Sequence, residues 1–222
     1  PEGSILNVRH PAAVAARHVI GHFLPHVVAG ALGQALPERV MAEGSANIWG
    51  IQVSGKDLAG APFTFVTFCS GGTGARATKD GLSATAFPSG VLGTPVEVIE
   101  TLSPLVVERK CLREGSGGSG CYRGGLGQTI AFRVRTHEPF VCSILGDRTR
   151  VPAAGFLGGA PGAPGLVLID GVAPANPKAE QTVPPGALVE VHLPGGGGYG
   201  PAAGRPPDLV ARDLLEGYCV PP

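Results

Sequence analysis

Apolar residues recur in pairs every four positions near the N-terminus of the chain. This spacing predicts an amphipathic helix whose wide apolar stripe packs on another surface. Pro11 suits the first turn of such a helix, and Pro25 predicts a kink or break within it. Gly33 and Pro37 mark its expected end. The apolar pairs are Val19/Ile20, Phe23/Leu24, Val27/Val28, Ala31/Leu32 and Ala35/Leu36.

Downstream, the pattern changes to short β-branched and aromatic runs. Residues 63–69 predict a buried strand, and residues 50–62 a turn between two strands. We expect residues 94–100 to be extended, with Glu97 and Glu100 on opposite faces. Beyond residue 103, strand-like runs alternate with turns at roughly ten-residue spacing, which is typical of a β-sandwich or barrel. These runs cover residues 104–112, 128–134, 139–145, 166–169 and 187–193, and a short terminal helix is expected at 207–217.

Together these elements predict an α+β fold in two parts. Residues 1–102 would hold the helix and a glycine-loop segment, as the C-terminal part of a larger domain. Residues 103–222 would form a β-rich domain that ends in the short helix. The chain has 36 glycines and 22 prolines among 222 residues, a composition at which disorder is considered. Because 43% of the residues are hydrophobic, a folded, turn-rich protein is favoured.

Charge and cysteine content narrow the range of partners and compartments. Seventeen basic residues balance seventeen acidic ones, so we expect neither a nucleic-acid groove nor a membrane surface as partner. The sequence has no uninterrupted apolar run of about 18 residues, which argues against a membrane span. Five cysteines without a C-x-x-C pair predict reduced thiols and a cytoplasmic protein. Since the chain begins with Pro1 and not Met, we expect a fragment or a processed piece.

A glycine-rich loop at residues 71–81 is the strongest candidate for a site. Its glycines allow backbone amides to approach another group without a Cβ in the way. A plain strand connection is an equally good interpretation of these residues alone. Two nearby near-matches to nucleotide-binding motifs, at residues 50–57 and 72–77, are attributed to chance because no helix is predicted after either one.

Other polar residues are weaker candidates. His18, His22 and His26 lie four apart, a spacing at which two imidazoles can share a metal ion. A partly solvated histidine stripe, or one packed on a partner subunit, is the favoured interpretation, and no metal ligand is assigned. Asp147, Arg148 and Lys178 are candidate substrate-binding residues, with ordinary surface ion pairs as the alternative.

The order of several motifs along the chain resembles the hydantoinase B/oxoprolinase family. The resemblance covers nearly the whole chain, which makes it more specific than any single motif. Its motifs are Pro-Ala-Ala-Val-Ala-Ala-Arg-His from Pro11, Gly-Gly-Thr-Gly-Ala-Arg from Gly71, Phe-Pro-Ser-Gly-Val from Phe87, Pro-Val-Glu-Val-Ile-Glu from Pro95, Ser-Gly-Gly-Ser-Gly from Ser116, Tyr-Arg-Gly-Gly-Leu-Gly-Gln from Tyr122, Asn-Pro-Lys from Asn176 and Pro-Gly-Gly-Gly-Gly-Tyr-Gly from Pro194.

The resemblance implies a subunit of an ATP-dependent cyclic amide hydrolase, of the N-methylhydantoinase or 5-oxoprolinase kind. An A-type partner would bind ATP and Mg²⁺ and phosphorylate the amide oxygen, and the B-type subunit would handle the activated intermediate. Family members are considerably longer, so the chain resembles their C-terminal portion and would be inactive alone. A divalent metal is expected in the preceding part, and no cofactor in this segment.

Within this picture the loop at residues 71–81 would carry the chemistry. Arg76 would hold a carboxylate or phosphate by paired hydrogen bonds, with Gly72 and Gly74 beside it as backbone donors. Gly71 is also a candidate substrate-binding residue. Asp80 would orient Arg76 or a water molecule. The substrate would be a small cyclic amide and the assembly a hetero-oligomer. A carboxylase subunit of the acetone or acetophenone kind, and a non-catalytic β-rich assembly module, remain the alternatives.

Overall fold

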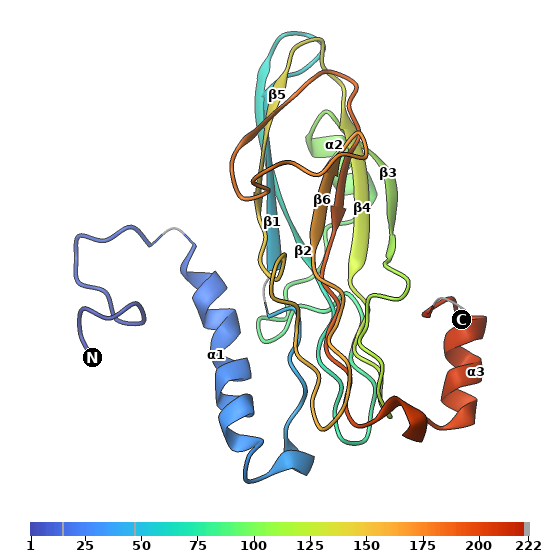
Figure 1. Ribbon diagram of the computed structural model, residues 1–222. Coiled ribbons are helices and arrows are strands. Elements are labelled where there is room, and N and C mark those ends of the chain that lie inside the picture. The colour runs from blue at the N-terminus through green and yellow to red at the C-terminus, as the bar shows by residue number, and fades with distance from the viewer. Residues whose placement is uncertain (15, 47, 220–222) are drawn as a thin grey trace.

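Two four-stranded sheets form the upper half of the molecule in a computed structural model that describes residues 1–14, 16–46 and 48–219 (Figure 1). All neighbouring strands are antiparallel. One sheet has the order β2-β1-β5-β7 and the other β3-β4-β8-β6. The strands are β1 (Ile48–Lys56), β2 (Pro62–Ser70), β3 (Leu105–Leu112), β4 (Gln128–Val134), β5 (Phe140–Leu145), β6 (Leu166–Ile169), β7 (Gln181–Val183) and β8 (Val189–His192).

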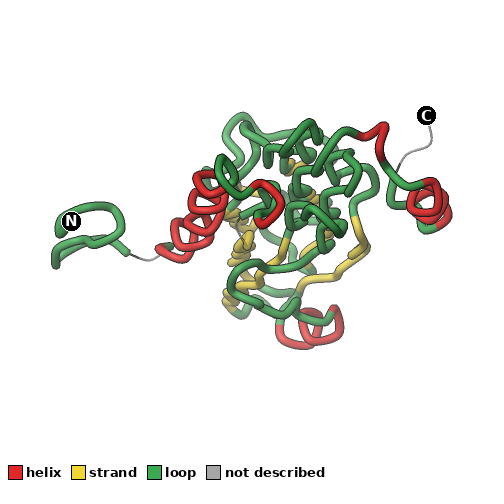
Figure 2. The backbone as a smooth tube through the Cα atoms, turned by 90° about the horizontal axis from the view of Figure 1, so that it is seen from below, coloured by secondary structure: helices red, strands yellow, loops and turns green. Residues whose placement is uncertain are grey.

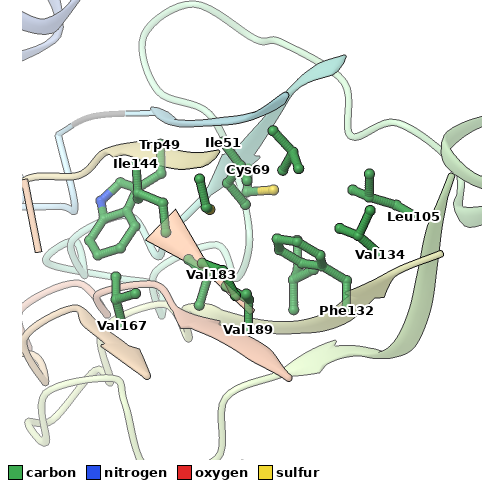
Figure 3. Close-up of a cluster of buried hydrophobic side chains, with 14 of the residues drawn as sticks. Trp49, Ile51, Cys69, Leu105, Phe132, Val134, Ile144, Val167, Val183 and Val189 are labelled. Carbon is green, nitrogen blue, oxygen red and sulfur yellow. The ribbon is translucent and has the colours of Figure 1, made fainter. Parts of the chain in front are cut away.

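The two sheets pack face to face around one hydrophobic core. Trp49 and Ile51 of β1 meet Phe132 of β4 and Val189 of β8 in a single buried cluster (Figure 3). Each of these side chains is at most 2% exposed. Alternating inward residues from two facing sheets define a sandwich, so the predicted α+β fold with a sandwich-like part is confirmed. Because β1 and β2 share a sheet with β5 and β7, the sandwich joins the segments on both sides of residue 103.

Three α-helices and two short 3₁₀ helices are described outside the strands. They are α1 (Arg17–Leu32), α2 (Val96–Leu102) and α3 (Pro207–Leu215), with η1 (Pro37–Arg39) and η2 (Ala202–Gly204). Figures 1 and 2 place α1 and α3 on opposite sides of the loops below the sandwich. Within the part of the chain that the structure describes, no helix has the length and apolar character that crossing a bilayer would need.

Three segments departed from the expected local structure, and one strand was not expected. Helix α1 begins at Arg17 and not at Pro11, and Pro25 does not break it. Residues 96–102 form a helix with Ile99 buried, where we expected an extended segment; the Val-Glu-Val alternation is too short to separate the two periods. Alternate side chains of β2 point away from the core, so much of the strand that we expected to be buried is exposed. Strand β7, only three residues long, was not predicted.

Below the sandwich, five segments, four of them rich in glycine, run beside one another and form what we call the glycine bundle (Figure 1). Backbone hydrogen bonds connect the segments. The Gly72 amide donates to Pro194 O at 3.0 Å, Gly125 N to Thr73 O at 2.8 Å, and Gly196 N to Gly125 O at 2.9 Å. The segments cover residues 41–46, 71–82, 115–127, 153–163 and 194–200.

Glycine is required in the bundle because the backbones leave no room for a Cβ atom. A Cβ atom on Gly72 would lie 1.8 Å from Gly125 O, and one on Gly124 would lie 1.9 Å from Gly196 O. Real Cβ contacts are essentially never shorter than 3.0 Å. The glycine-rich stretches are therefore neither linkers nor simple turns, but the packed lower half of the fold.

Candidate functional site

The predicted site loop is divided between the interior of the glycine bundle and its surface. Gly71, Gly72 and Gly74 are buried in the bundle. The Gly72 amide is hydrogen-bonded to Pro194 O, and a Cβ atom on Gly74 would lie 1.8 Å from Ala42 O. These glycines hold the loop in place through backbone packing, and the Gly72 amide that we expected to face a ligand is already occupied. The part of the loop from Arg76 to Asp80 reaches the surface beside α3.

Asp80 is the centre of a network of charge-assisted hydrogen bonds. Arg205, which follows η2, donates to both carboxylate oxygens of Asp80, at 2.8 and 2.9 Å. The Arg123 backbone amide donates to Oδ1 at 2.7 Å, and Arg212 of α3 reaches Oδ2 at 3.3 Å. Burial by itself opposes ionisation, but these hydrogen bonds and positive charges hold the pKa of Asp80 below its ordinary value. Asp80 is therefore a carboxylate at neutral pH.

A second carboxylate extends the network into the interior. Asp213 of α3 accepts hydrogen bonds on Oδ2 from Arg205 at 2.7 Å and from Arg123 Nε at 3.2 Å. The side chains of Asp213 and Arg123 are only 4% and 7% exposed. The Arg123 guanidinium also lies 5.0 Å from the centre of the Tyr218 ring. The network fixes α3 against the glycine bundle.

A cavity of about 570 Å³ opens beside this network. Arg76, Lys79, Arg123 and Arg212 line it together with Asp80. The Arg76 guanidinium donates to the backbone oxygen of Asp80 at 3.0 Å, so the two predicted residues are in contact, though not through the carboxylate. Glu216 lines the cavity as well, so four basic side chains stand against two acidic ones, and one of these, Asp80, is engaged by Arg205. Such a wall suits an anionic group such as a carboxylate or a phosphate.

Four residues of this site were not expected from the sequence. Arg123, Arg205, Arg212 and Asp213 lie 43 to 133 positions beyond Asp80, and no spacing rule connects them to it. The one available signal was an isolated arginine inside a glycine run, at Arg123. Only the packing of the glycine segments and of α3 brings these charges together.

The other predicted residues gather on the opposite side, beside α1. Asp147, Arg148 and Lys178 line a separate cavity of about 590 Å³. Lys178 pairs with Asp147 at 2.6 Å, and Arg148 pairs with Glu43 at 2.9 Å. The structure thus brings these three together but separates them from Asp80 and Arg76, which line a different cavity.

The histidines and the buried cysteines are placed in packed surroundings. His22 Nε2 lies 2.9 Å from Ser89 Oγ, and His26 Nδ1 accepts from the Gly44 amide at 3.4 Å. Across the residues that the structure describes, no group of three histidine, cysteine, aspartate or glutamate side chains could hold a metal ion. Burial raises the pKa of both Cys69 and Cys142 to about 12, so these two thiols are poor nucleophiles at neutral pH.

Comparison with known proteins identifies the family. The family model described as hydantoinase B/oxoprolinase matches residues 1–202. The chain belongs to the hydantoinase B/oxoprolinase family. The match ends before α3, so Asp80 and Arg123 lie inside it, whereas Arg212 and Asp213 lie beyond it.

Individual members of the hydantoinase B/oxoprolinase family resemble most of the chain. An uncharacterized protein of Methanocaldococcus jannaschii is 34% identical over 97% of this chain and 38% of its own length. The caprolactamase subunit beta of Pseudomonas jessenii is 30% identical over 98% of this chain and 40% of its own length. A crystal structure of the ATP-dependent caprolactamase from Pseudomonas jessenii matches with a TM-score of 0.76 and 25% identity, over 96% of this chain and 39% of that one. The chain therefore spans about two fifths of the length of these relatives.

Proposed function

We propose that this chain is the C-terminal portion of the B-type subunit of an ATP-dependent cyclic amide hydrolase. It would act with an ATP-binding A-type subunit. Family membership and the likeness to a caprolactamase subunit support the reaction class. The structural observation that carries the proposal is the cationic cavity beside Asp80, because each intermediate of an ATP-activated hydrolysis is an anion.

The proposed reaction proceeds in three steps. The partner subunit transfers the terminal phosphoryl group of ATP to the amide oxygen, which turns a poor leaving group into a good one. Water then adds to the ring carbon and the ring C–N bond breaks, which gives an amine and an acyl phosphate, and a second water molecule cleaves the acyl phosphate to a carboxylate and phosphate. ATP and Mg²⁺ belong to the partner in this scheme, and a divalent metal belongs to a part of the subunit outside this chain.

The residues of the cavity would bind and orient the anionic intermediate. Arg76, whose guanidinium is held by the Asp80 carbonyl, and Lys79 supply positive charge at the entrance. Asp80 is ionised and engaged by Arg205, so it acts as a positioning residue and not as a proton donor. In this assignment Arg76 contacts the substrate. Asp80 acts indirectly, by positioning Arg76 and Arg205.

The test is an assay of the complete subunit together with its A-type partner. Hydantoin, 5-oxoproline and caprolactam are offered in turn, and ADP, phosphate and the ring-opened product are quantified with and without ATP. We expect ATP-dependent ring opening of at least one substrate only when both subunits are present. Incorporation of labelled bicarbonate without ring opening would instead assign the subunit to a carboxylase. Full activity of the partner alone would leave this subunit as an assembly module.

A substitution tests the cavity separately. Arg76→Gln removes one charged hydrogen-bond donor, which should lower kcat/KM by about 10- to 100-fold while the fold is kept. Arg135→Gln, at an exposed arginine that lines a different cavity, is the matched control and should leave kcat/KM unchanged. Equal effects of the two substitutions would contradict the role of the cavity.

A further inference from the structure

Helix α1 is turned so that His22 and His26 face the protein and many of its apolar side chains face outward. His22 and His26 are each only 5% exposed, and they lie against Ser89 and Gly44. On the outer face the exposed fractions are 40% for Leu24, 66% for Val27, 56% for Val28 and 49% for Leu32. We call these four residues, together with Leu36 just beyond the helix at 40%, the outer face of α1. Contiguous apolar surface of this kind on a soluble protein marks an interaction site.

A hollow extends this apolar surface from α1 onto the sandwich. The cavity between α1 and the end of β5 has a volume of about 330 Å³. Val19 and Ile20 line it from the helix, and Ile144 and Leu145 from the strand. Lys178 and Asp147 border the same cavity as a polar rim. An apolar surface with a hollow and a charged rim has the anatomy of a protein interface.

Two glycines on α1 give an independent sign that another backbone approaches. Gly21 and Gly30 lie within the helix, where each costs about 1 kcal/mol of stability relative to alanine. A Cβ atom at either position would meet nothing within 4 Å in the described chain. The bundle glycines differ, because neighbouring backbones leave no space there. Glycine at an exposed helix position is useful when a second element packs closely on the helix.

The relatives indicate what the second element is. Two relatives match almost the whole of this chain, and the chain covers 38% and 40% of their lengths. The part of each relative outside the match is therefore about one and a half times as long as the matched part. We propose that the outer face of α1 is an internal interface of the subunit, covered by an apolar element of that additional chain. The proposal rests on family membership and on the surface of α1, and it holds whichever reaction the subunit performs.

The first experiment compares α1 in two forms of the protein by hydrogen exchange. One form is the 222-residue chain and the other is the product of the complete natural reading frame. We expect the amides from Leu24 to Leu32 to be protected at least tenfold more strongly in the complete product. A complete product no longer than 222 residues would overturn the proposal, and so would equal protection in the two forms.

A pair of variants then tests the surface itself. Val27→Asp should lower the thermal midpoint of the complete product by several degrees and leave that of the 222-residue chain nearly unchanged. Val172→Asp is the matched control, since Val172 is 69% exposed in a turn away from α1, and it should affect neither form. Equal effects of Val27→Asp on the two forms would contradict the interface.

Gly30→Ala gives a signature that a general loss of stability cannot produce. In the 222-residue chain it should raise the thermal midpoint, because alanine favours the helix and the new methyl group meets nothing. In the complete product it should lower the midpoint, because the methyl group meets the covering element. An increase in both forms would overturn the proposal.

Protection of α1 that appears only with an A-type subunit, or only as the concentration of the 222-residue chain rises, would replace the proposed occupant with that subunit or with a second copy.

Discussion

The sandwich and the glycine bundle are held together in opposite ways. In the sandwich, large side chains such as Trp49 and Phe132 fill the space between two sheets. In the bundle, side chains are absent where segments meet, and backbone carbonyls and amides pack directly on one another. The sandwich therefore depends on side-chain volume, which can vary a little at modest cost. The bundle depends on the absence of a Cβ atom, which leaves no such tolerance.

This difference also explains where the site lies. Polar side chains buried in the bundle, such as Thr73 and Ser116, are hydrogen-bonded to its backbone, so the charged groups that could meet a ligand lie at its edges. Asp80 and Arg76 leave the bundle on the α3 side, and Arg148 and Lys178 gather on the α1 side.

The largest effect is expected from a single methyl group in the bundle. Gly72→Ala places a Cβ atom 1.8 Å from Gly125 O, so the segments must separate, and we expect a loss of more than about 4 kcal/mol in the free energy of unfolding. The measurement is urea denaturation followed by circular dichroism. Gly30→Ala, where a Cβ atom meets nothing within 4 Å, is the control and should not destabilise the 222-residue chain. A small effect at Gly72 would mean that the bundle can open locally.

The sandwich should respond to a lost side chain in a graded manner. Phe132→Ala removes a ring that is 2% exposed and should cost about 3–5 kcal/mol. Phe132→Leu keeps most of the volume and should cost clearly less, which the same urea titration would measure. If the two substitutions cost equally, side-chain volume would not be what stabilises the sandwich.

The ion network at the edge of the bundle should give an intermediate effect. Arg205→Lys keeps the charge but cannot donate to both oxygens of Asp80 and to Asp213 at once, so we expect a loss of about 1–3 kcal/mol. Arg9→Lys alters an exposed pair with Glu2 and should change stability by less than about 0.5 kcal/mol. A loss at Arg205 no larger than that at Arg9 would show that α3 is held by other contacts.

The smallest effect is a pH dependence that comes from buried histidines. Burial, followed by the charge of Arg148, lowers the pKa of His26, and burial together with Arg113 lowers that of His192. Unfolding restores the ordinary value near 6.5, so below that pH the unfolded chain takes up protons first and stability falls as the pH decreases. His26→Gln should reduce this loss of stability at low pH, while the share that comes from His192 should remain. The measurement is the thermal midpoint of each protein between pH 7.5 and 5. An unchanged profile would contradict the assignment to His26.

The sequence determined most of the local elements by itself. The strands near residues 105–112, 128–134, 140–145 and 166–169 and the helix α3 follow from side-chain periodicity and turn residues, which act over a few positions. The order of motifs was enough to place the chain in its family. Residues 96–102 were one exception, because a seven-residue segment shows too few turns to distinguish a helix from a strand.

Tertiary structure alone decided how these elements combine. Whether the 71–81 loop faces a ligand or a neighbouring backbone depends on four other segments that are distant in sequence, and no local signal reports them. Asp80 acquires its arginine partners only when α3 docks on the bundle. The same holds for α1, because its periodicity predicts two faces but not which one turns inward. Local periodicity encodes the elements, whereas close backbone packing and long-range charge pairing require the complete fold.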